Sequence, residues 1–323
     1  MSAARLRALG AALLLAVVAS AGGTALQSRA GASDPVYVEW PALLPGLTDE
    51  YDPGSSNDCV AGKLSCITAM VREMERRYRP LAASCSHQAL FALTYLRVTQ
   101  TYAWSAQQPG YYPDVRWTNH AVAVFAKYYL RAYDDWTADN SSTAVPRAWR
   151  LAFDAARDRT ASGSGNFFLG LNAHINRDLA FAMAAAGLVG RDGVSEKPNF
   201  DRVNRLLNSV SVPLVAELAA RLDPSMDDSA SPFHVDAVAT GNLMFGWREQ
   251  AWRNAELLST SSDLLRPTVA ATIETNAVTQ ATAYASALRY VPPALTSAER
   301  DAWCAAHNGD PAPVAYPFGV PSG

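Results

Sequence analysis

The feature that most constrains the fold is a helical spacing of apolar residues that recurs through most of the chain. Ile67, Met70, Val71, Met74 and Tyr78, for example, fall on one helical face at steps of three and four residues. No alternating apolar run flanks a hairpin dipeptide, and no internal repeat of fixed period occurs. The sequence therefore predicts an all-α, single-domain bundle of about seven to nine helices.

Proline, glycine and polar stretches set the expected helix boundaries. Pro80 is expected to end the first helix, Pro213 to kink a later one, and Ser162–Gly165 to form a flexible turn. Thr296 and Glu299 resemble a capping box that opens a short last helix carrying Cys304. The longer helices are expected at about 64–80, 82–107, 113–136, 147–157, 166–188, 200–222, 233–258 and 262–290.

Residues 1–21 have the layout of a cleavable export signal. Arg5 and Arg7 precede an apolar stretch from Ala11 to Val18, and Ala19-Ser20-Ala21 fits a small-residue cleavage site. The arginines are not adjacent, which favours the general secretory route and a secreted protein without a stable membrane span. An uncleaved membrane anchor is the alternative.

The composition is that of an ordinary globular protein. The chain is 49% hydrophobic and 18% charged with net charge -3, so it has no basic surplus that would favour nucleic acid as a partner. We expect a flexible N-terminal segment and loop over residues 22–57, one helical domain over 58–310, and a C-terminal tail over 311–323.

Four cysteines remain after export, at Cys59, Cys66, Cys85 and Cys304. An even number in an oxidising compartment favours two disulfides, and three pairings are open. We favour Cys59–Cys66, which closes a small loop, together with Cys85–Cys304, which ties the C-terminal segment to the second helix. A zinc cluster is the alternative, but no Cys-x-x-Cys occurs and the spacings do not match structural zinc sites.

The most unusual segment is GLNAHINRD at residues 170–178, which is polar within an otherwise very apolar helix. His174 and Asp178 are four residues apart and share a face. This spacing suits two ligands of one metal, or a carboxylate that orients an imidazole for proton transfer. A buried histidine satisfied by an aspartate one turn later is also a common structural device, and for the pair alone that interpretation is favoured.

Most of the histidines lie on or beside inward helical faces, where bundles build metal sites. A lone histidine on an apolar face is more often a core residue, and His307 in the tail looks incidental. The candidate ligands of a divalent metal such as zinc are His87, His174 and Asp178, with His120 and His234, which is followed by Asp236, as further candidates.

The segment FGWREQAWRNAELL at 245–258 places Arg248 between inward aromatic residues. This arginine can pair with Asp178 or bind a carboxylate or phosphate of a ligand. The alternative is an arginine that buries its stem and keeps its head in water. The candidate substrate-binding residues are Asn172, Asn176 and Trp252.

Three segments together resemble an uncharacterised actinobacterial family of exported helical proteins. They are CSHQALFALTYLR (85–97), FLGLNAHINRDLAFAM (168–183) and FGWREQAWRNAELL (245–258), and the family signature is a Leu-Gly-x-Asn-x-His-Ile-Asn-x-Asp-Leu helix. The resemblance covers most of the mature chain. It supports the choice of His174, Asn176 and Asp178 but implies no activity for them.

A second, more limited resemblance is to the exported zinc phospholipase C and P1-type nuclease group. His174 and Asp178 match its His-x-x-x-Asp element, while its N-terminal tryptophan and its later His-x-x-x-Glu element have no counterpart. The resemblance therefore argues against three zinc ions and leaves a site for one or two metal ions open.

Two functions follow from these residues. The first is an exported metal-dependent or acid–base hydrolase, with His174 as ligand or base, Asp178 and His87 as further ligands, and Arg248 as an anion clamp. The second is a noncatalytic exported protein that binds a small apolar or amphiphilic ligand, with the His, Asp and Arg residues structural. Its pocket would be lined by aromatic residues such as Tyr95, Tyr102, Trp117 and Phe168. Histidines that converge on an open cavity would favour the enzyme.

Overall fold

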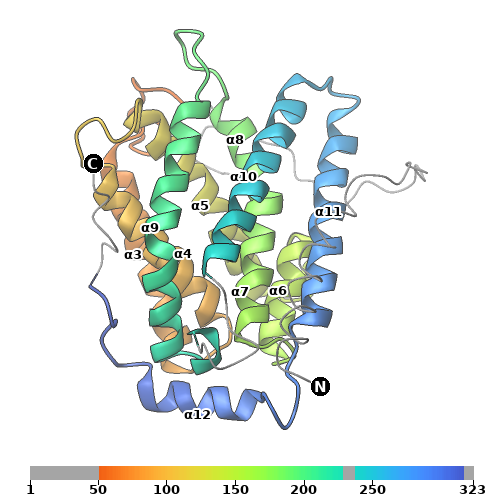
Figure 1. Cartoon of the computed structure of the whole chain (residues 1–323). Helices are drawn as coiled ribbons and strands as arrows, with labels where there is room; N and C mark the ends of the chain where they lie inside the picture. The colour runs from red at the N-terminus through yellow and green to blue at the C-terminus, as the bar shows by residue number, and fades with distance from the viewer. Residues whose placement is uncertain (1–50, 228–236, 316–323) are drawn as a thin grey trace.

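The computed structural model describes residues 51–227 and 237–315 (Figure 1). The expected signal peptide, His234 and Asp236 lie outside the described residues. Within them the chain forms helices and three isolated β-bridges but no strand, which confirms the all-α prediction. The described residues contain nine α-helices when α7, η1 and α8 are counted as one, together with the short 3-10 helix η2. The elements are α3 (Leu64–Ala83), α4 (Ala89–Ser105), α5 (Val115–Ala138), α6 (Arg147–Arg157), α7 (Gly163–Leu171), η1 (Asn172–Asp178), α8 (Leu179–Ala186), α9 (Lys197–Arg221), η2 (Pro224–Asp227), α10 (Ala237–Thr260), α11 (Arg266–Ala287) and α12 (Ser297–His307).

The continuous helix formed by α7, η1 and α8 is the centre of the bundle. Every residue from 161 to 183 is buried, as expected for a helix that is apolar on all sides. This central helix packs against α4, α5, α6, α10 and α11. In Figure 1, α10 stands in front of it with α9 and α11 on either side, and α12 lies across one end of the bundle.

The central helix widens into π-helical turns at Asn172–Asp178, the polar segment that the sequence singled out. A π-helical turn holds more residues than an α-helical turn, and such insertions occur frequently at functional sites. Asn172, Asn176 and Arg177 donate hydrogen bonds to α11, whereas Asp178 accepts one from α6. The polar side chains of this segment therefore contact two different helices.

Two helix boundaries near the start differ from expectation. Helix α3 continues past Pro80 to Ala83, because a proline in the last turn removes only one hydrogen bond near the helix end. Helix α4 begins at Ala89 rather than near residue 82, because Cys85 has a φ of 51° that interrupts the helix. His87 therefore lies in the turn before α4 and not on its inward face.

The expected flexible turn at residues 162–165 is the first turn of α7. The side chain of Ser162 caps the helix by accepting a hydrogen bond from the Gly165 N–H at 3.2 Å. A Cβ on Gly163 would collide with the Asp223 carboxylate, and one on Gly165 would collide with the Leu288 carbonyl oxygen. These glycines therefore permit close packing.

Both favoured disulfides are present, Cys59–Cys66 and Cys85–Cys304. The second joins α12 to the turn between α3 and α4, and not to α4 itself as the sequence led us to expect. All four sulfurs are paired, which excludes the zinc cluster as the role of these cysteines. Two disulfides indicate an oxidising environment. No helix in the described ranges is long and apolar enough to cross a membrane.

Candidate functional site

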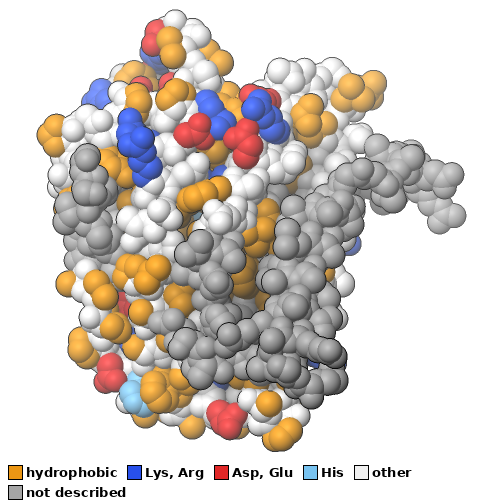
Figure 2. All heavy atoms as spheres, viewed as in Figure 1, with side chains coloured by type: hydrophobic (Ala, Val, Ile, Leu, Met, Phe, Trp, Pro, Cys, Tyr) orange, Lys and Arg blue, Asp and Glu red, His pale blue; other side chains and the backbone are white. Residues whose placement is uncertain are grey.

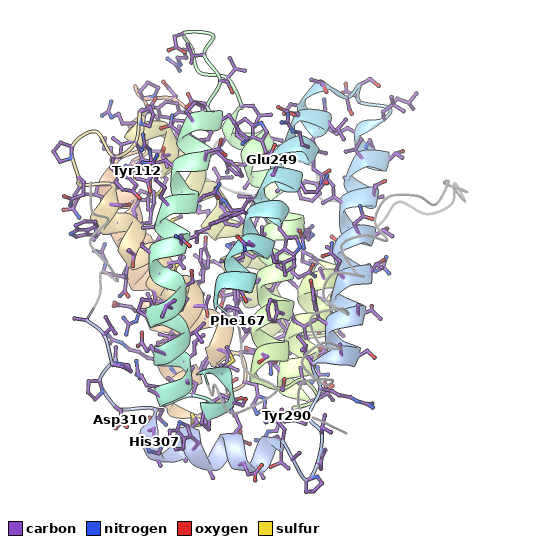
Figure 3. All side chains as sticks on the ribbon, in the orientation of Figure 1. Tyr112, Phe167, Glu249, Tyr290, His307 and Asp310 are labelled. Atoms are coloured by element: carbon purple, nitrogen blue, oxygen red, sulfur yellow. A yellow bond between two sulfur atoms is a disulfide. The ribbon has the colours of Figure 1, made fainter. Side chains whose placement is uncertain are left out.

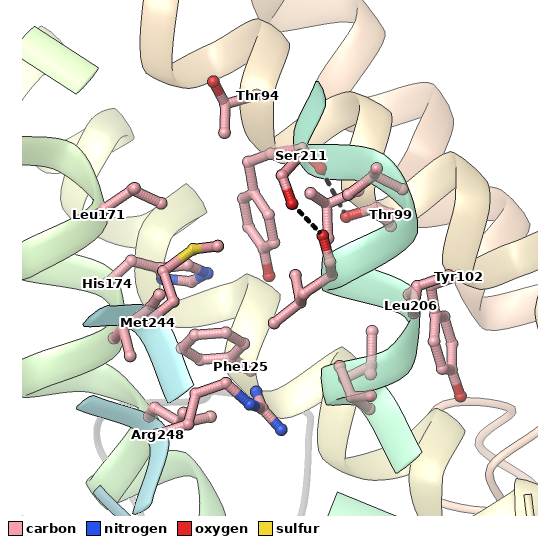
Figure 4. A pocket seen from close by; sticks show the side chains of 18 of the residues that line it. Thr94, Thr99, Tyr102, Phe125, Leu171, His174, Leu206, Ser211, Met244 and Arg248 are labelled. Atoms are coloured by element: carbon pink, nitrogen blue, oxygen red, sulfur yellow. Dashed lines mark hydrogen bonds between the residues drawn. The ribbon is translucent and has the colours of Figure 1, made fainter. Parts of the chain in front are cut away.

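An elongated cavity lies between α9 and α10 on one side and α4, α5 and the central helix on the other (Figure 4). Its volume is about 120 Å³. Carbon atoms dominate the wall, with side chains such as Phe125, Leu171, Leu206, Val210 and Met244. The apolar wall is that of a site for a small organic molecule.

Four of the serine and threonine hydroxyl groups in the wall add little polarity to it. Those of Thr94, Thr99, Thr118 and Ser211 each donate to the backbone carbonyl four residues earlier, at 2.7 to 2.8 Å. Such bonds turn the oxygen toward the helix and leave the carbon atoms facing the space. The wall is consequently more apolar than its residue types indicate.

Arg248 is the exception in this wall. Its Nε donates to Asn204 Oδ1 at 2.6 Å, its Nη2 donates to the Phe200 carbonyl oxygen at 2.7 Å, and its guanidinium lies 4.1 Å from the centre of the Phe200 ring. The residue is 5% exposed and makes no ion pair within the described ranges. Burial lowers the pKa of Arg248 to about 10, so it remains charged at neutral pH. It does not pair with Asp178.

The cavity runs along the bundle axis. In Figure 4, Arg248 and Thr94 lie on opposite sides of it, with His174 and Met244 between them. Figure 3 places Glu249, the neighbour of Arg248, near the end of the bundle opposite α12. The charged end of the cavity is therefore distant from α12.

His174 forms part of the cavity wall through its ring. It stacks on Phe125, with 3.6 Å between ring centres, and meets the ring of Tyr95 edge-on at 4.2 Å. Its Nδ1 lies 3.6 Å from Asp178 Oδ2, beyond hydrogen-bond length, and both ring nitrogens are buried without a hydrogen bond in the described structure. Burial lowers the pKa of His174 more than the Asp178 carboxylate raises it, so the ring is neutral.

Asp178 belongs to a buried charge network rather than to the cavity wall. Its Oδ2 accepts a hydrogen bond from Trp149 Nε1 at 2.7 Å, and its Oδ1 accepts one from Arg177 Nη1 at 2.5 Å. Arg177 Nε also donates to Glu274, whose other oxygen accepts from the Ala148 N–H at 3.1 Å. Burial alone would lower the pKa of Arg177, but the two carboxylates overcome it and raise that pKa. The network joins η1 to α6 and α11.

The sequence interpretation missed Arg177, Trp149 and Glu274 as partners of Asp178. One signal was present, because Arg177 is a charged residue inside the most apolar helix and a buried charge needs a counter-charge. A second signal was Glu274, which lies among the small buried residues of α11. Neither pattern shows which residue of another helix pairs with Arg177 or Asp178.

The three candidate substrate-binding residues lie outside the cavity wall. Asn172 donates to the Ala277 carbonyl oxygen at 2.8 Å, and Asn176 donates to Gln280 at 3.1 Å, so both connect η1 to α11. Trp252 donates to Glu256 at 2.9 Å. Of the four aromatic residues expected to line a pocket, Tyr95, Tyr102 and Trp117 do so, whereas Phe168 is replaced by its neighbour Phe167.

His87 lies apart from His174 and Asp178. Its Nε2 is 3.0 Å from Asp301 of α12, and its ring meets Tyr290 edge-on. Figure 3 places Tyr290 beside α12. His120 is placed separately, with Nδ1 3.0 Å from the Cys59 carbonyl oxygen.

The expected metal set of His87, His174 and Asp178 is therefore not assembled. Within the described residues, no group of three or more His, Cys, Asp or Glu side chains is arranged to hold a metal ion. The physical reason is the turn at Cys85, which keeps His87 off the inward face of α4.

Comparisons with known proteins identify a family but no relative of known activity. No curated protein and no solved structure matches the chain. A family model does match residues 67–287, a range that contains α4 to α10, the whole cavity and the charge network. The chain belongs to the family of unknown function DUF5995.

Proposed function

We propose that the protein binds a small apolar or amphiphilic molecule in the cavity between α9, α10 and the central helix. The observation that carries the proposal is the wall itself, which is almost entirely apolar and in which the hydroxyls of Thr94, Thr99, Thr118 and Ser211 are bonded to their own helices. An apolar space favours burial of an apolar ligand, because transfer of the ligand's apolar surface out of water is favourable.

The same geometry gives less support to hydrolysis. A general base must reach the proton that it removes, but both nitrogens of His174 are buried beneath neighbouring rings. The oxygens of Asp178 already accept hydrogen bonds from Trp149 and Arg177. These residues are better suited to hold the central helix in place than to activate water.

We also propose that binding takes place outside the cytoplasm. Two disulfides support this, because such bonds persist in oxidising compartments. The export signal expected over residues 1–21 points to the same location.

The test is a fluorescence titration with the neutral apolar dye N-phenyl-1-naphthylamine. Val210→Trp fills the cavity from α9, whereas Val212→Trp adds the same ring at a position that is 62% exposed on that helix. We expect saturable binding by the wild type, weakening of about tenfold or more in Val210→Trp, and no change in Val212→Trp.

Ala121→Leu provides a smaller filling substitution from α5 should Val210→Trp fail to fold, and circular dichroism checks each variant. Absence of saturable binding by the folded wild type would overturn the proposal. So would unchanged affinity in folded variants that fill the cavity.

A further inference from the structure

Arg248 places a full positive charge in an otherwise uncharged wall. Among the described residues that line the cavity it is the one with a permanent charge, because burial keeps His174 neutral. An isolated buried charge is costly unless a counter-charge or hydrogen bonds compensate it. Its present partners, an amide oxygen and a carbonyl oxygen, are both neutral.

Hydrogen bonds fix the guanidinium of Arg248 through Nε and Nη2 and leave Nη1 without a partner among the described residues. Nε and Nη2 are held by Asn204 and the Phe200 carbonyl, and the Phe200 ring packs against the group. Nη1 has no hydrogen bond in the described structure. A rigid guanidinium with a free N–H edge is well suited to bind an oxyanion.

The nearest acidic side chains are already engaged by another cation. Lys197 Nζ lies 2.6 Å from Asp201 and 2.8 Å from Glu249, and Arg253 adds a contact to Glu249 at 3.0 Å. Figure 2 shows basic (blue) and acidic (red) side chains gathered at the upper ends of α9 and α10. Neither carboxylate forms an ion pair with Arg248, although the charge of Asp201 partly opposes the effect of burial on the pKa of Arg248.

The apolar part of the cavity constrains the remainder of a ligand whose anionic group is bound to Arg248. At a rise of about 1.5 Å per residue, the stretch of α9 from Phe200 to Leu214 that lines the space is roughly 20 Å long. The wall along this stretch carries no second cation, so one negative charge is the most that it can neutralise. A long apolar chain fits the remainder.

We propose that Arg248 binds the head group of a long-chain carboxylic acid, whose chain extends past Met244 and Val210 toward Leu214. This inference rests on the proposed function, and it adds the chemical class of the ligand. A carboxylate matches the free edge and the single charge of the guanidinium. A phosphate dianion would bring a second charge that the wall cannot neutralise.

The experiment is isothermal titration calorimetry with dodecanoate, dodecanol, dodecylammonium and dodecyl phosphate, each below its aggregation concentration. The wild type should bind dodecanoate at least about tenfold more tightly than dodecanol, and dodecylammonium most weakly. Arg248→Met should abolish the preference for dodecanoate while the affinity for dodecanol stays within about twofold. Arg253→Met, on the exposed side of the same helix, should keep the preference.

The outcomes separate the two proposals. Equal affinity of the wild type for dodecanoate and dodecanol would overturn the role of Arg248 and leave the apolar site intact. Tighter binding of dodecyl phosphate than of dodecanoate would overturn the carboxylate assignment. Absence of binding by all four compounds would overturn the proposed function itself. The wild-type series decides these points even if Arg248→Met does not fold.

Discussion

The indole N–H of Trp149 donates to the Asp178 carboxylate at 2.7 Å in the buried centre of the bundle. The bond links α6 to the π-helical turns, and Arg177 occupies the other carboxylate oxygen. The His–Asp pair that is most conspicuous in the sequence is therefore part of a structural network. Its histidine contributes a ring to the neighbouring cavity wall.

Removal of the only cation in this network should destabilise the protein strongly. Arg177→Met would leave Asp178 and Glu274 buried without a counter-charge, at an expected cost of about 3–5 kcal/mol in the free energy of unfolding. The triple variant Arg177→Met, Asp178→Asn, Glu274→Gln removes all three charges and should recover part of that loss. Urea unfolding followed by circular dichroism measures both, and a triple variant no more stable than Arg177→Met would contradict this explanation.

Acidification should reduce stability through His87. Burial and then Arg300 lower the pKa of His87 to about 4, and the opposing effect of Asp301 is smaller. Arg159, which also pairs with Asp301, lowers it further. In the unfolded chain His87 is protonated below about pH 6.5, whereas in the folded protein it stays neutral until about pH 4. The stability that is present above pH 6.5 is therefore lost as the pH falls toward 4.

The loss attributable to His87 is up to about 3 kcal/mol over this range. Urea unfolding at several pH values should show a flatter pH dependence for His87→Gln than for the wild type. The substitution leaves His174 in place, so the difference between the two curves reports His87. Identical slopes between pH 6.5 and 4 would show that His87 is not the group responsible.

Gly170 permits the close approach of α7 to α4. A Cβ at this position would overlap the ring of Phe91, so Gly170→Ala should lower the melting temperature and cost about 1–3 kcal/mol. Gly246→Ala is the matched control, because no atom lies within 4 Å of its added Cβ on the exposed face of α10. It should raise stability by about 0.5–1 kcal/mol, since alanine favours helix. Similar shifts in both variants would argue against the proposed contact.

The two disulfides should differ in how much they stabilise the fold. Cys85–Cys304 spans 219 residues and Cys59–Cys66 spans 7. In the loop-entropy account, their replacement by serine pairs costs roughly 5 and roughly 2 kcal/mol respectively. Urea unfolding of the two double variants measures the order, and a larger loss from the short loop would contradict it.

The helical class was predictable because the spacing of apolar residues reports local geometry. The boundaries that failed depend on single backbone conformations, such as the left-handed Cys85, or on tertiary packing, such as Gly163 against Asp223. The spacing of apolar residues reports neither a single backbone conformation nor a tertiary contact. The favoured pairing of the cysteines is present, and two disulfides were expected because an even number of cysteines behind a predicted export signal favours pairing.

The candidate site was predictable only in part. Arg248 stood out as a charge among inward aromatic residues, and the aromatic character of the wall was anticipated through Tyr95, Tyr102 and Trp117. The cavity itself is a property of how α9 and α10 pack on the central helix, which no local pattern contains. The π-helical turns at Asn172–Asp178 also have no marker in the sequence.

The most direct test of the account is a crystal structure of the protein with 12-bromododecanoic acid, whose bromine is located by anomalous scattering. The account predicts a carboxylate bound to Arg248 and a bromine peak at the far end of the cavity, near Leu214 and Phe167. A bromine on the protein surface, or a carboxylate bound away from Arg248 in an occupied cavity, would contradict it.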